Sequence, residues 1–282
     1  MTNSAQSETR GRLPAGIVIL CVLIAIAAAG MSIALPYYRQ YRTIEYIDNH
    51  DGYVETEPDG PRWLSAYLSQ DAMRTFESVS KVTLEESVLS DAILLHLATL
   101  PDLDWLCLKG NQFTDVDLIQ LSRFTTLTQL ELRGTGITDA GLVHLRGLPN
   151  LAWLQIGADI TDAGLFHLSG LTNLELLRVG GPGITDAGLL HLSRLKKLEW
   201  LILSQSSVTD AGLAHLTTHT GLERLQIVDA DITDAGLEHL VRMTNLKLLD
   251  VRGTRISESG IETLQKGLPK CEIWEPGAVW HH

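Results

Sequence analysis

"ITDAGLVHL", at residues 137–145, is the clearest copy of a motif that this chain repeats along most of its length. Close copies occupy residues 160–168, 184–192, 208–216 and 232–240, and fainter copies start at Leu89, Phe113 and Ile256. The acidic residue of the motif recurs every 24 residues, except for one step of 23 between Asp139 and Asp162. A fixed period of this length predicts a solenoid of stacked units.

Each unit contains a strand and then a helix. Leu127, Leu130 and Leu132 open one unit, and the last two alternate with polar residues, as in a strand with one buried face. In the motif, Thr138 suits a helix N-cap, and Asp139 places negative charge at the positive end of the helix dipole. Strands stack about 4.8 Å apart and helices about 8–10 Å apart, so we expect an arc with a parallel sheet on its concave face.

The unit Leu-x-x-Leu-x-Leu-x-x-Thr-x-Ile-Thr-Asp-Ala-Gly-Leu-x-His-Leu resembles the leucine-rich repeat, in a subclass common in bacterial proteins and in eukaryotic F-box receptors. The resemblance covers residues 79 to about 275. It implies an α/β solenoid of about eight repeats that recognises other macromolecules on its concave face and shares no catalytic activity. An apolar segment, not an F-box, precedes the repeats, so we do not expect a role in a ubiquitin ligase.

The family places an Asn where each strand turns, and polar side chains stand at that position here: Ser87, Asn111, Thr135, Ser206 and Thr254. The resemblance implies that these side chains bond the turn backbone to the next repeat. One unit is a residue short, and we expect a local irregularity there.

Residues 13–35 contain no charged side chain. A helix of this length measures about 34 Å, enough to cross a hydrocarbon core of about 30 Å. Tyrosines and arginines follow within residues 37–42, as interfacial anchors do. The sequence therefore predicts a single-pass membrane protein, with the repeats on the extracytoplasmic side because a short basic tail precedes the span. A signal peptide cleaved near residues 27–29, which would give a secreted protein, is the alternative.

These signals divide the chain into five parts. We expect a polar tail at 1–12, a transmembrane helix at 13–36, a juxtamembrane segment and N-terminal cap at 37–75, repeats at 76–275 and a C-terminal tail at 276–282. Within the cap, residues 38–47 suit a short helix and residues 53–57 alternate as a strand does. A solenoid needs a cap over its first unit; a flexible linker is the alternative.

The composition argues against several functions. Lys and Arg number 22 against 34 Asp and Glu, which gives a formal net charge of −12. No stripe of basic residues runs along the repeats, so we expect no nucleic-acid binding. Cys21, Cys107 and Cys271 match neither a disulfide framework nor a metal signature. The sequence contains no motif for a nucleophilic serine, a zinc protease helix, a phosphate loop or a redox dithiol. We therefore expect a protein that is not an enzyme and that takes no cofactor or metal.

Histidines form a column on the predicted helices: His96, His144, His167, His191, His215 and His239. Helices about 8–10 Å apart are too distant for zinc, whose bonds are about 2 Å long. Asp139 and His144 lie about 140° apart around a helix, so they cannot form a catalytic pair. We interpret these histidines as packing residues between units.

Candidate binding residues occupy the strand positions that face away from the predicted core. They are Trp105, Gln129, Glu131, Trp153, Gln155, Leu176, Arg178, Trp200, Ile202, Arg224 and Gln226. Tryptophan and arginine with a polar rim are typical of interface hot spots. Two interpretations stay open: these side chains bind a protein ligand, or they cover one another or the N-terminal segment.

The leading hypothesis is a membrane-anchored, non-catalytic module that binds a protein ligand through its concave face. One alternative is a structural envelope spacer whose repeats associate with copies of themselves. A glycan-binding surface protein is a further alternative, which the tryptophan column does not distinguish from a protein binder.

Overall fold

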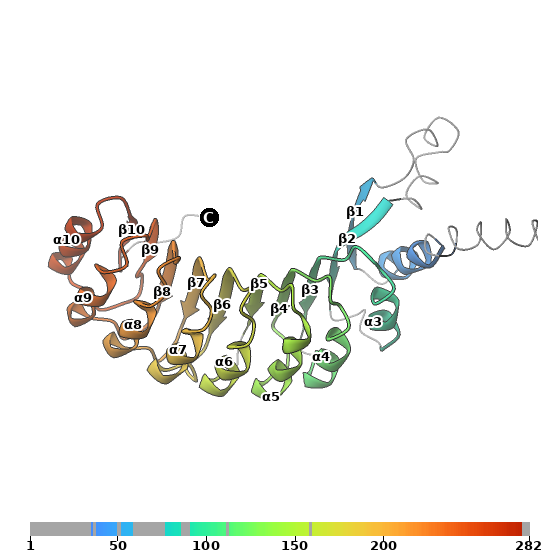
Figure 1. The fold of residues 1–282 in the computed structure, drawn as a ribbon, viewed down its shortest axis with the longest axis horizontal. Coiled ribbons are helices and arrows are strands. Elements are labelled where there is room, and N and C mark those ends of the chain that lie inside the picture. The colour runs from blue at the N-terminus through green and yellow to red at the C-terminus, as the bar shows by residue number, and fades with distance from the viewer. Residues whose placement is uncertain are drawn as a thin grey trace, which may run out of the picture.

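The computed structural model describes residues 35, 38–49, 52–58, 77–85, 91–110, 113–157 and 160–277. Within them the chain forms an arc, with strands along its inner side and helices along its outer side (Figure 1). The segment predicted to cross a membrane lies outside these residues, apart from Leu35. No helix in the described part of the chain has the length and apolar character that a membrane span needs.

The strands are β1 (Tyr53–Pro58), β2 (Glu77–Leu84), β3 (Trp105–Lys109), β4 (Gln129–Arg133), β5 (Trp153–Ile156), β6 (Leu176–Gly180), β7 (Trp200–Ser204), β8 (Arg224–Val228), β9 (Leu248–Asp250) and β10 (Glu272–Trp274). The helices are α3 (Asp91–Leu97), α4 (Asp115–Leu121), α5 (Asp139–Leu142) with η4 (Val143–Gly147), α6 (Asp162–Leu168), α7 (Asp186–Leu192), α8 (Asp210–Leu216), η5 (Asp234–Gly236) with α9 (Leu237–Leu240), and α10 (Glu258–Gly267). A further helix covers residues 38–48.

The described strands form one sheet in chain order, and β2 to β10 are parallel. Equivalent positions of successive repeats stand in register, as Leu106, Leu130 and Leu154 do. The predicted parallel sheet on the concave face of a strand–helix arc is confirmed. Strand β1 is antiparallel to β2 at the N-terminal end of the sheet.

A continuous leucine core fills the space between sheet and helices. Leu130 and Leu132 of β4 are fully buried, and so is Leu142 of α5. Each buried leucine contributes about 1.5–3 kcal/mol relative to an exposed one. At the N-terminal end, Ile44 and Ile47 of helix 38–48 belong to the same core. The helix expected at 38–47 and the strand expected at 53–57 are both present.

A ladder of hydrogen bonds joins the first turns of neighbouring helices. Asp162 accepts from the backbone nitrogen of Thr185 at 2.8 Å and from its hydroxyl at 2.6 Å. Thr185 in turn caps α7 by accepting from the nitrogen of Ala187 at 3.3 Å. Gly188 completes the contact, because a Cβ built there would lie 2.2 Å from Asp162 Oδ1.

The same pairs recur along the arc: Asp115 with Thr138, Asp139 with Thr161, Asp186 with Thr209, Asp210 with Thr233 and Asp234 with Ser257. The threonine N-caps were predicted correctly. The aspartates do stand in the first turn, as the dipole argument requires, but their carboxylates also bind the next repeat.

The polar side chains at the strand turns do not bond to the next repeat at the three described positions, Thr135, Ser206 and Thr254. The hydroxyls of Thr135 and Ser206 are buried and have no hydrogen-bond partner within the described residues. Thr254 donates to the carbonyl of Val251 in its own repeat, at 2.6 Å. The prediction was wrong for these three residues. The hydrogen bonds between neighbouring repeats are made by the Asp–Thr pairs instead. Ser87 and Asn111 lie outside the described residues.

Candidate functional site

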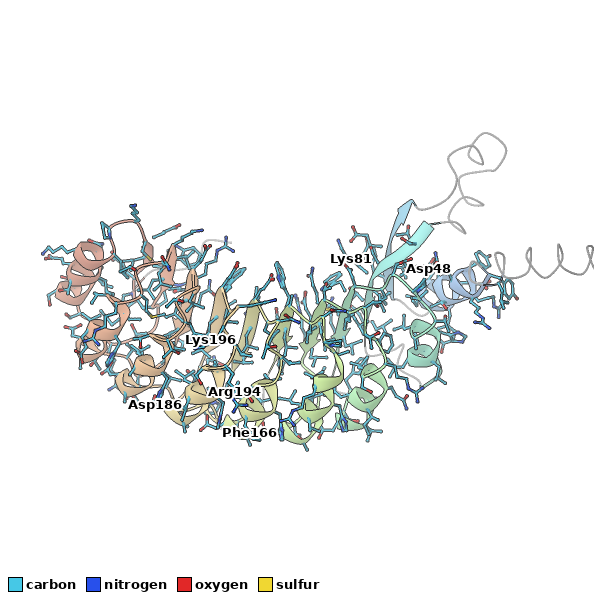
Figure 2. The ribbon with its side chains drawn as sticks, viewed as in Figure 1. Asp48, Lys81, Phe166, Asp186, Arg194 and Lys196 are labelled. Atoms are coloured by element: carbon cyan, nitrogen blue, oxygen red, sulfur yellow. The ribbon has the colours of Figure 1, made fainter. Side chains whose placement is uncertain are left out.

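A groove of about 310 Å³ lies on the concave face. Its lining includes every predicted binding residue except Arg224, which lines a smaller adjoining pocket of about 130 Å³. Figure 2 shows strand side chains projecting into the inner side of the arc. The strands bring these residues together because each repeat places the same two outward positions in register with those of its neighbours.

One column of the groove alternates large aromatic side chains with smaller ones. In register across the sheet it contains Trp105, Gln129, Trp153, Leu176, Trp200 and Arg224. Trp153 is 44% exposed, whereas Leu176, between two tryptophans, is only 9% exposed. Ile202 in the neighbouring column is 6% exposed. Leu176 and Ile202 face away from the leucine core, as predicted, but they are nearly buried and form the apolar floor of the groove.

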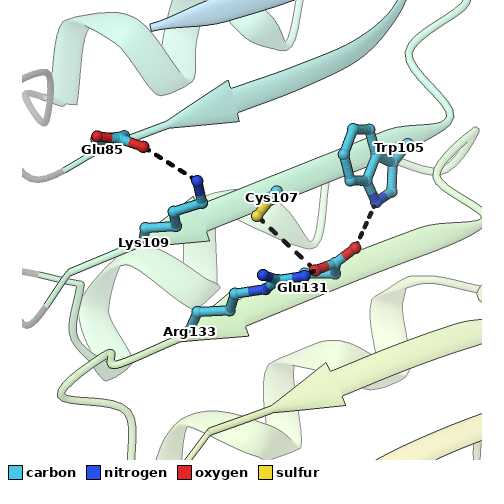
Figure 3. Close-up of polar contacts among 6 residues, drawn as sticks. All are labelled: Glu85, Trp105, Cys107, Lys109, Glu131 and Arg133. Atoms are coloured by element: carbon cyan, nitrogen blue, oxygen red, sulfur yellow. Dashed lines mark hydrogen bonds and ion pairs between the residues drawn. The ribbon is translucent and has the colours of Figure 1, made fainter. Parts of the chain in front are cut away.

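A polar cluster fixes the N-terminal end of the groove (Figure 3). Glu131 accepts from Trp105 Nε1 at 3.1 Å and from Arg133 Nε at 2.8 Å. The Cys107 thiol lies 4.0 Å from the same carboxylate. Burial, and then the charge of Glu131, raise the pKa of Cys107, so this thiol stays protonated and weakly nucleophilic. Glu131 therefore orients Trp105 and has little capacity left for a ligand.

Cations cover one face of two tryptophan rings. The Arg224 guanidinium lies over the ring of Trp200, 5.0 Å from its centroid, and Lys81 Nζ lies 6.0 Å from the centroid of Trp105. Both distances are within the range of cation–π attraction. Each of these two rings therefore has one face occupied by a cation of this chain.

Hydrogen-bond donors along the groove are free to meet a ligand. Within the described part of the chain, the side chains of Gln129, Gln155, Arg178 and Gln226 make no hydrogen bond or ion pair. The three amides and the guanidinium supply many more N–H donors than the groove supplies free carboxylates.

An acidic row borders the groove where the strands begin. Glu175 and Glu199 line the smaller pocket beside Trp153 and Trp200, and both are exposed. Glu223 continues the row, but Lys247 pairs with it at 2.6 Å. Among the described residues, neither Glu175 nor Glu199 has such a partner.

The histidine column lies on the helices of the outer side of the arc, and three of its members pack against aromatic rings. Phe166, labelled in Figure 2, meets the rings of His167 and His191 edge-on at 5.7 and 5.3 Å. His96 stacks on Tyr46 of helix 38–48 at 5.9 Å. No group of three or more His, Cys, Asp or Glu side chains is placed to hold a metal ion within the residues described.

Comparison with known proteins agrees with this architecture. Residues 125–145 match a family model described as a leucine-rich repeat. Internalin C2 of Listeria monocytogenes is similar in structure, with a TM-score of 0.52, 26% identity and coverage of 73% of this chain and 84% of that one.

Two other bacterial structures are similar at lower scores. A leucine-rich repeat protein of Leptospira interrogans has a TM-score of 0.48 at 22% identity, covering 63% of this chain and 44% of that one. Internalin F of Listeria monocytogenes has a TM-score of 0.48 at 21% identity, covering 64% and 56%. The chain thus spans less than two thirds of the length of these two proteins.

No curated protein matches the sequence. With one matched repeat and an internalin of similar structure, the chain has the fold of a leucine-rich repeat solenoid, an architecture typical of protein-binding modules.

Proposed function

We propose that the concave face of this arc binds a protein ligand and that the chain acts as a recognition module without catalysis. The groove of about 310 Å³ carries the proposal, because it combines tryptophan rings, an apolar floor and donors without partners. None of these side chains is needed for the core, which lies on the other side of the sheet. Partly exposed tryptophan and arginine side chains are the residue types that contribute most to protein interfaces.

Residues 13–35 anchor these repeats to a membrane in this proposal, with the groove on the extracytoplasmic side. The uncharged segment and the arginines and tyrosines after it support the anchor. In helix 38–48, which follows, Tyr38, Tyr41 and Arg42 are exposed, whereas Thr43 and Ile44 are buried against the repeats. The exposed side is thus free to lie in an interface.

Site-specific photocrosslinking in native membranes tests the groove. A photoreactive phenylalanine analogue replaces Trp153 in the full-length protein, and a matched variant carries it at Leu190, an exposed position on outer helix α7. We expect position 153 to capture a defined protein that position 190 does not. Identical products at both positions, or crosslinks only to a second copy of the chain, would contradict the proposal; the latter would favour the envelope spacer.

Protease treatment of intact cells tests the anchor and its direction. An epitope tag after His282 should be lost from intact cells while a cytoplasmic control protein survives. Protection of the tag until lysis would reverse the proposed orientation, and tagged protein free in the medium would show a secreted form.

A further inference from the structure

The tryptophans of the groove recur at one defined spacing. Trp105, Trp153 and Trp200 lie in register on β3, β5 and β7, each two strands from the next. With strands about 4.8 Å apart, the backbones of successive tryptophans are about 9.6 Å apart along the sheet. A ligand that contacts all three must present an equivalent side chain at about this interval.

Among regular peptide conformations, polyproline II has the best matching repeat. It advances about 3.1 Å per residue with three residues per turn, so one face returns every ~9.3 Å. An extended β-strand returns the same face after about 6.8 Å, and an α-helix completes a turn in about 5.4 Å. The strand therefore does not match the tryptophan spacing, and the helix presents the same face again only after two turns, at about 10.5 Å, which is a poorer match than polyproline II.

Hydrogen-bonding capacity leads to the same ligand. A polyproline II segment forms no internal hydrogen bonds, and its prolines have no N–H, so it presents mainly carbonyl acceptors. The groove presents the complementary groups, since Gln129, Gln155, Gln226 and Arg178 supply donors. Glu131, the carboxylate in the groove, is already held by Trp105 and Arg133.

Charge at the border of the groove adds a further requirement. Glu175 and Glu199 are exposed beside Trp153 and Trp200. A lysine or arginine next to the apolar residues of the ligand would meet these carboxylates. The whole chain carries a formal net charge of −12, which also favours a basic partner.

We propose that the groove binds a proline-rich protein segment in the polyproline II conformation, lying across β3 to β7 with apolar residues at every third position and a basic residue beside Glu175 and Glu199. This inference rests on the proposed function and specifies its ligand.

A glycan fits the same spacing less well. Sugar rings stack on open aromatic faces, but Arg224 lies over Trp200 and Lys81 lies over Trp105. Apolar side chains, in contrast, can insert between rings onto the floor formed by Leu176 and Ile202. The observations therefore favour a peptide.

Fluorescence anisotropy with defined peptides tests the inference on full-length protein in detergent micelles. The probe is a labelled peptide, Leu-Pro-Pro-Leu-Pro-Pro-Leu-Pro-Pro-Lys. One matched peptide replaces every proline with glycine and keeps the leucine spacing; another replaces the lysine with glutamine. Cellohexaose serves as a competing glycan.

We expect the proline peptide to bind at least about tenfold more tightly than the glycine peptide, because it is preorganised. Trp153→Ala should weaken it about tenfold or more, while Leu190→Ala on the outer surface leaves it unchanged. Glu175→Gln should weaken the lysine peptide about threefold and spare the glutamine peptide. Circular dichroism confirms that each variant is folded.

Equal affinity for the proline and glycine peptides would overturn the inference, as would binding of cellohexaose without the peptide. If no peptide binds while position 153 still crosslinks one defined protein, this inference fails and the proposed function stands. If photocrosslinking captures no defined protein and no peptide binds, the proposed function and this inference both fail.

Discussion

Replacing Gly188 with alanine should destabilise the repeats, even though alanine is the better helix former by about 1 kcal/mol. Gly188 lies in α7, and a Cβ built there would be 2.2 Å from Asp162 Oδ1 and 2.9 Å from Leu165 Cδ1. The Asp162 carboxylate must therefore move. It then loses the hydrogen bonds that it accepts from Thr185, at 2.8 Å from the backbone nitrogen and 2.6 Å from the hydroxyl.

The size of the effect follows from those two bonds. Hydrogen bonds to a charged group contribute about 1.5–3 kcal/mol each, so losing both costs about 3–6 kcal/mol. Asp162 and Thr185 are partly exposed, which places the loss towards the lower end because water replaces part of the interaction. Subtracting the helix-propensity gain of about 1 kcal/mol leaves a net destabilisation of about 2–4 kcal/mol.

Urea unfolding followed by circular dichroism measures this effect, with Gly170→Ala as the matched control. The nearest atoms to a Cβ at Gly170 belong to Arg146 and lie 3.9 Å away, so this control should change stability by less than about 0.5 kcal/mol. In an Asp162→Ala background, Gly188→Ala should become neutral or stabilising by up to about 1 kcal/mol. An increase in stability in the wild-type background, or the same cost in both backgrounds, would refute the reasoning.

Three further predictions concern single contacts. Hydrogen bonds from Ser257 lower the pKa of Asp234 from its usual 3.8. The stability that they supply is therefore present above that pH and is lost as the pH falls through the folded-state pKa. In Ser257→Ala, the urea midpoint should decrease less steeply on acidification. Burial lowers the pKa of His219 from its usual 6.5. The unfolded chain therefore takes up the proton at a higher pH than the folded chain, and stability should fall on acidification below about 6.5. This dependence should disappear when the urea midpoint of His219→Leu is measured against pH. Asn173 donates to the carbonyl of Pro149 in the preceding repeat at 2.7 Å, and Asn173→Ala should cost about 0.5–1.5 kcal/mol in urea titrations.

Periodicity predicts what happens within one repeat better than what happens between repeats. The spacing of Leu130 and Leu132 correctly predicted a strand with one buried face, and Thr138 was correctly predicted as an N-cap. The hydrogen bonds between Asp139 and Thr161 could not be predicted from residue spacing. They depend on how close the first turns of two stacked helices lie, which a list of residue positions does not contain. The repeated Asp and Gly were signals of this contact, since the Asp carboxylate occupies the space beside the Gly of the next repeat, which has no side chain.

For the groove, too, periodicity predicts features within one repeat but not contacts between repeats. Alternation along each strand was sufficient to predict which residues leave the core, and those residues do line the concave face. Their exposure depends on cross-strand neighbours of different size. Leu176 is covered because Trp153 and Trp200 stand on either side of it. Such coverage requires the register of three strands, which only the folded arrangement supplies.

The one short repeat shows how this architecture separates its scaffold from its binding face. Asp139 and Thr161 are one residue closer in sequence than Asp162 and Thr185, yet their bonds have the same lengths, 2.8 and 2.6 Å. On the sheet side, β5 and β6 remain in register. The missing residue is therefore absorbed between Ile156 of β5 and Asp162 of α6: the Asp–Thr ladder keeps its geometry, whereas the pairing of β5 with β6 covers three residue pairs and that of β6 with β7 covers five. Because these two systems hold each repeat at both sides, an exposed strand position such as Trp153 can change chemically without a large change in stability. Variation at such positions is therefore the route by which this fold can acquire a new ligand.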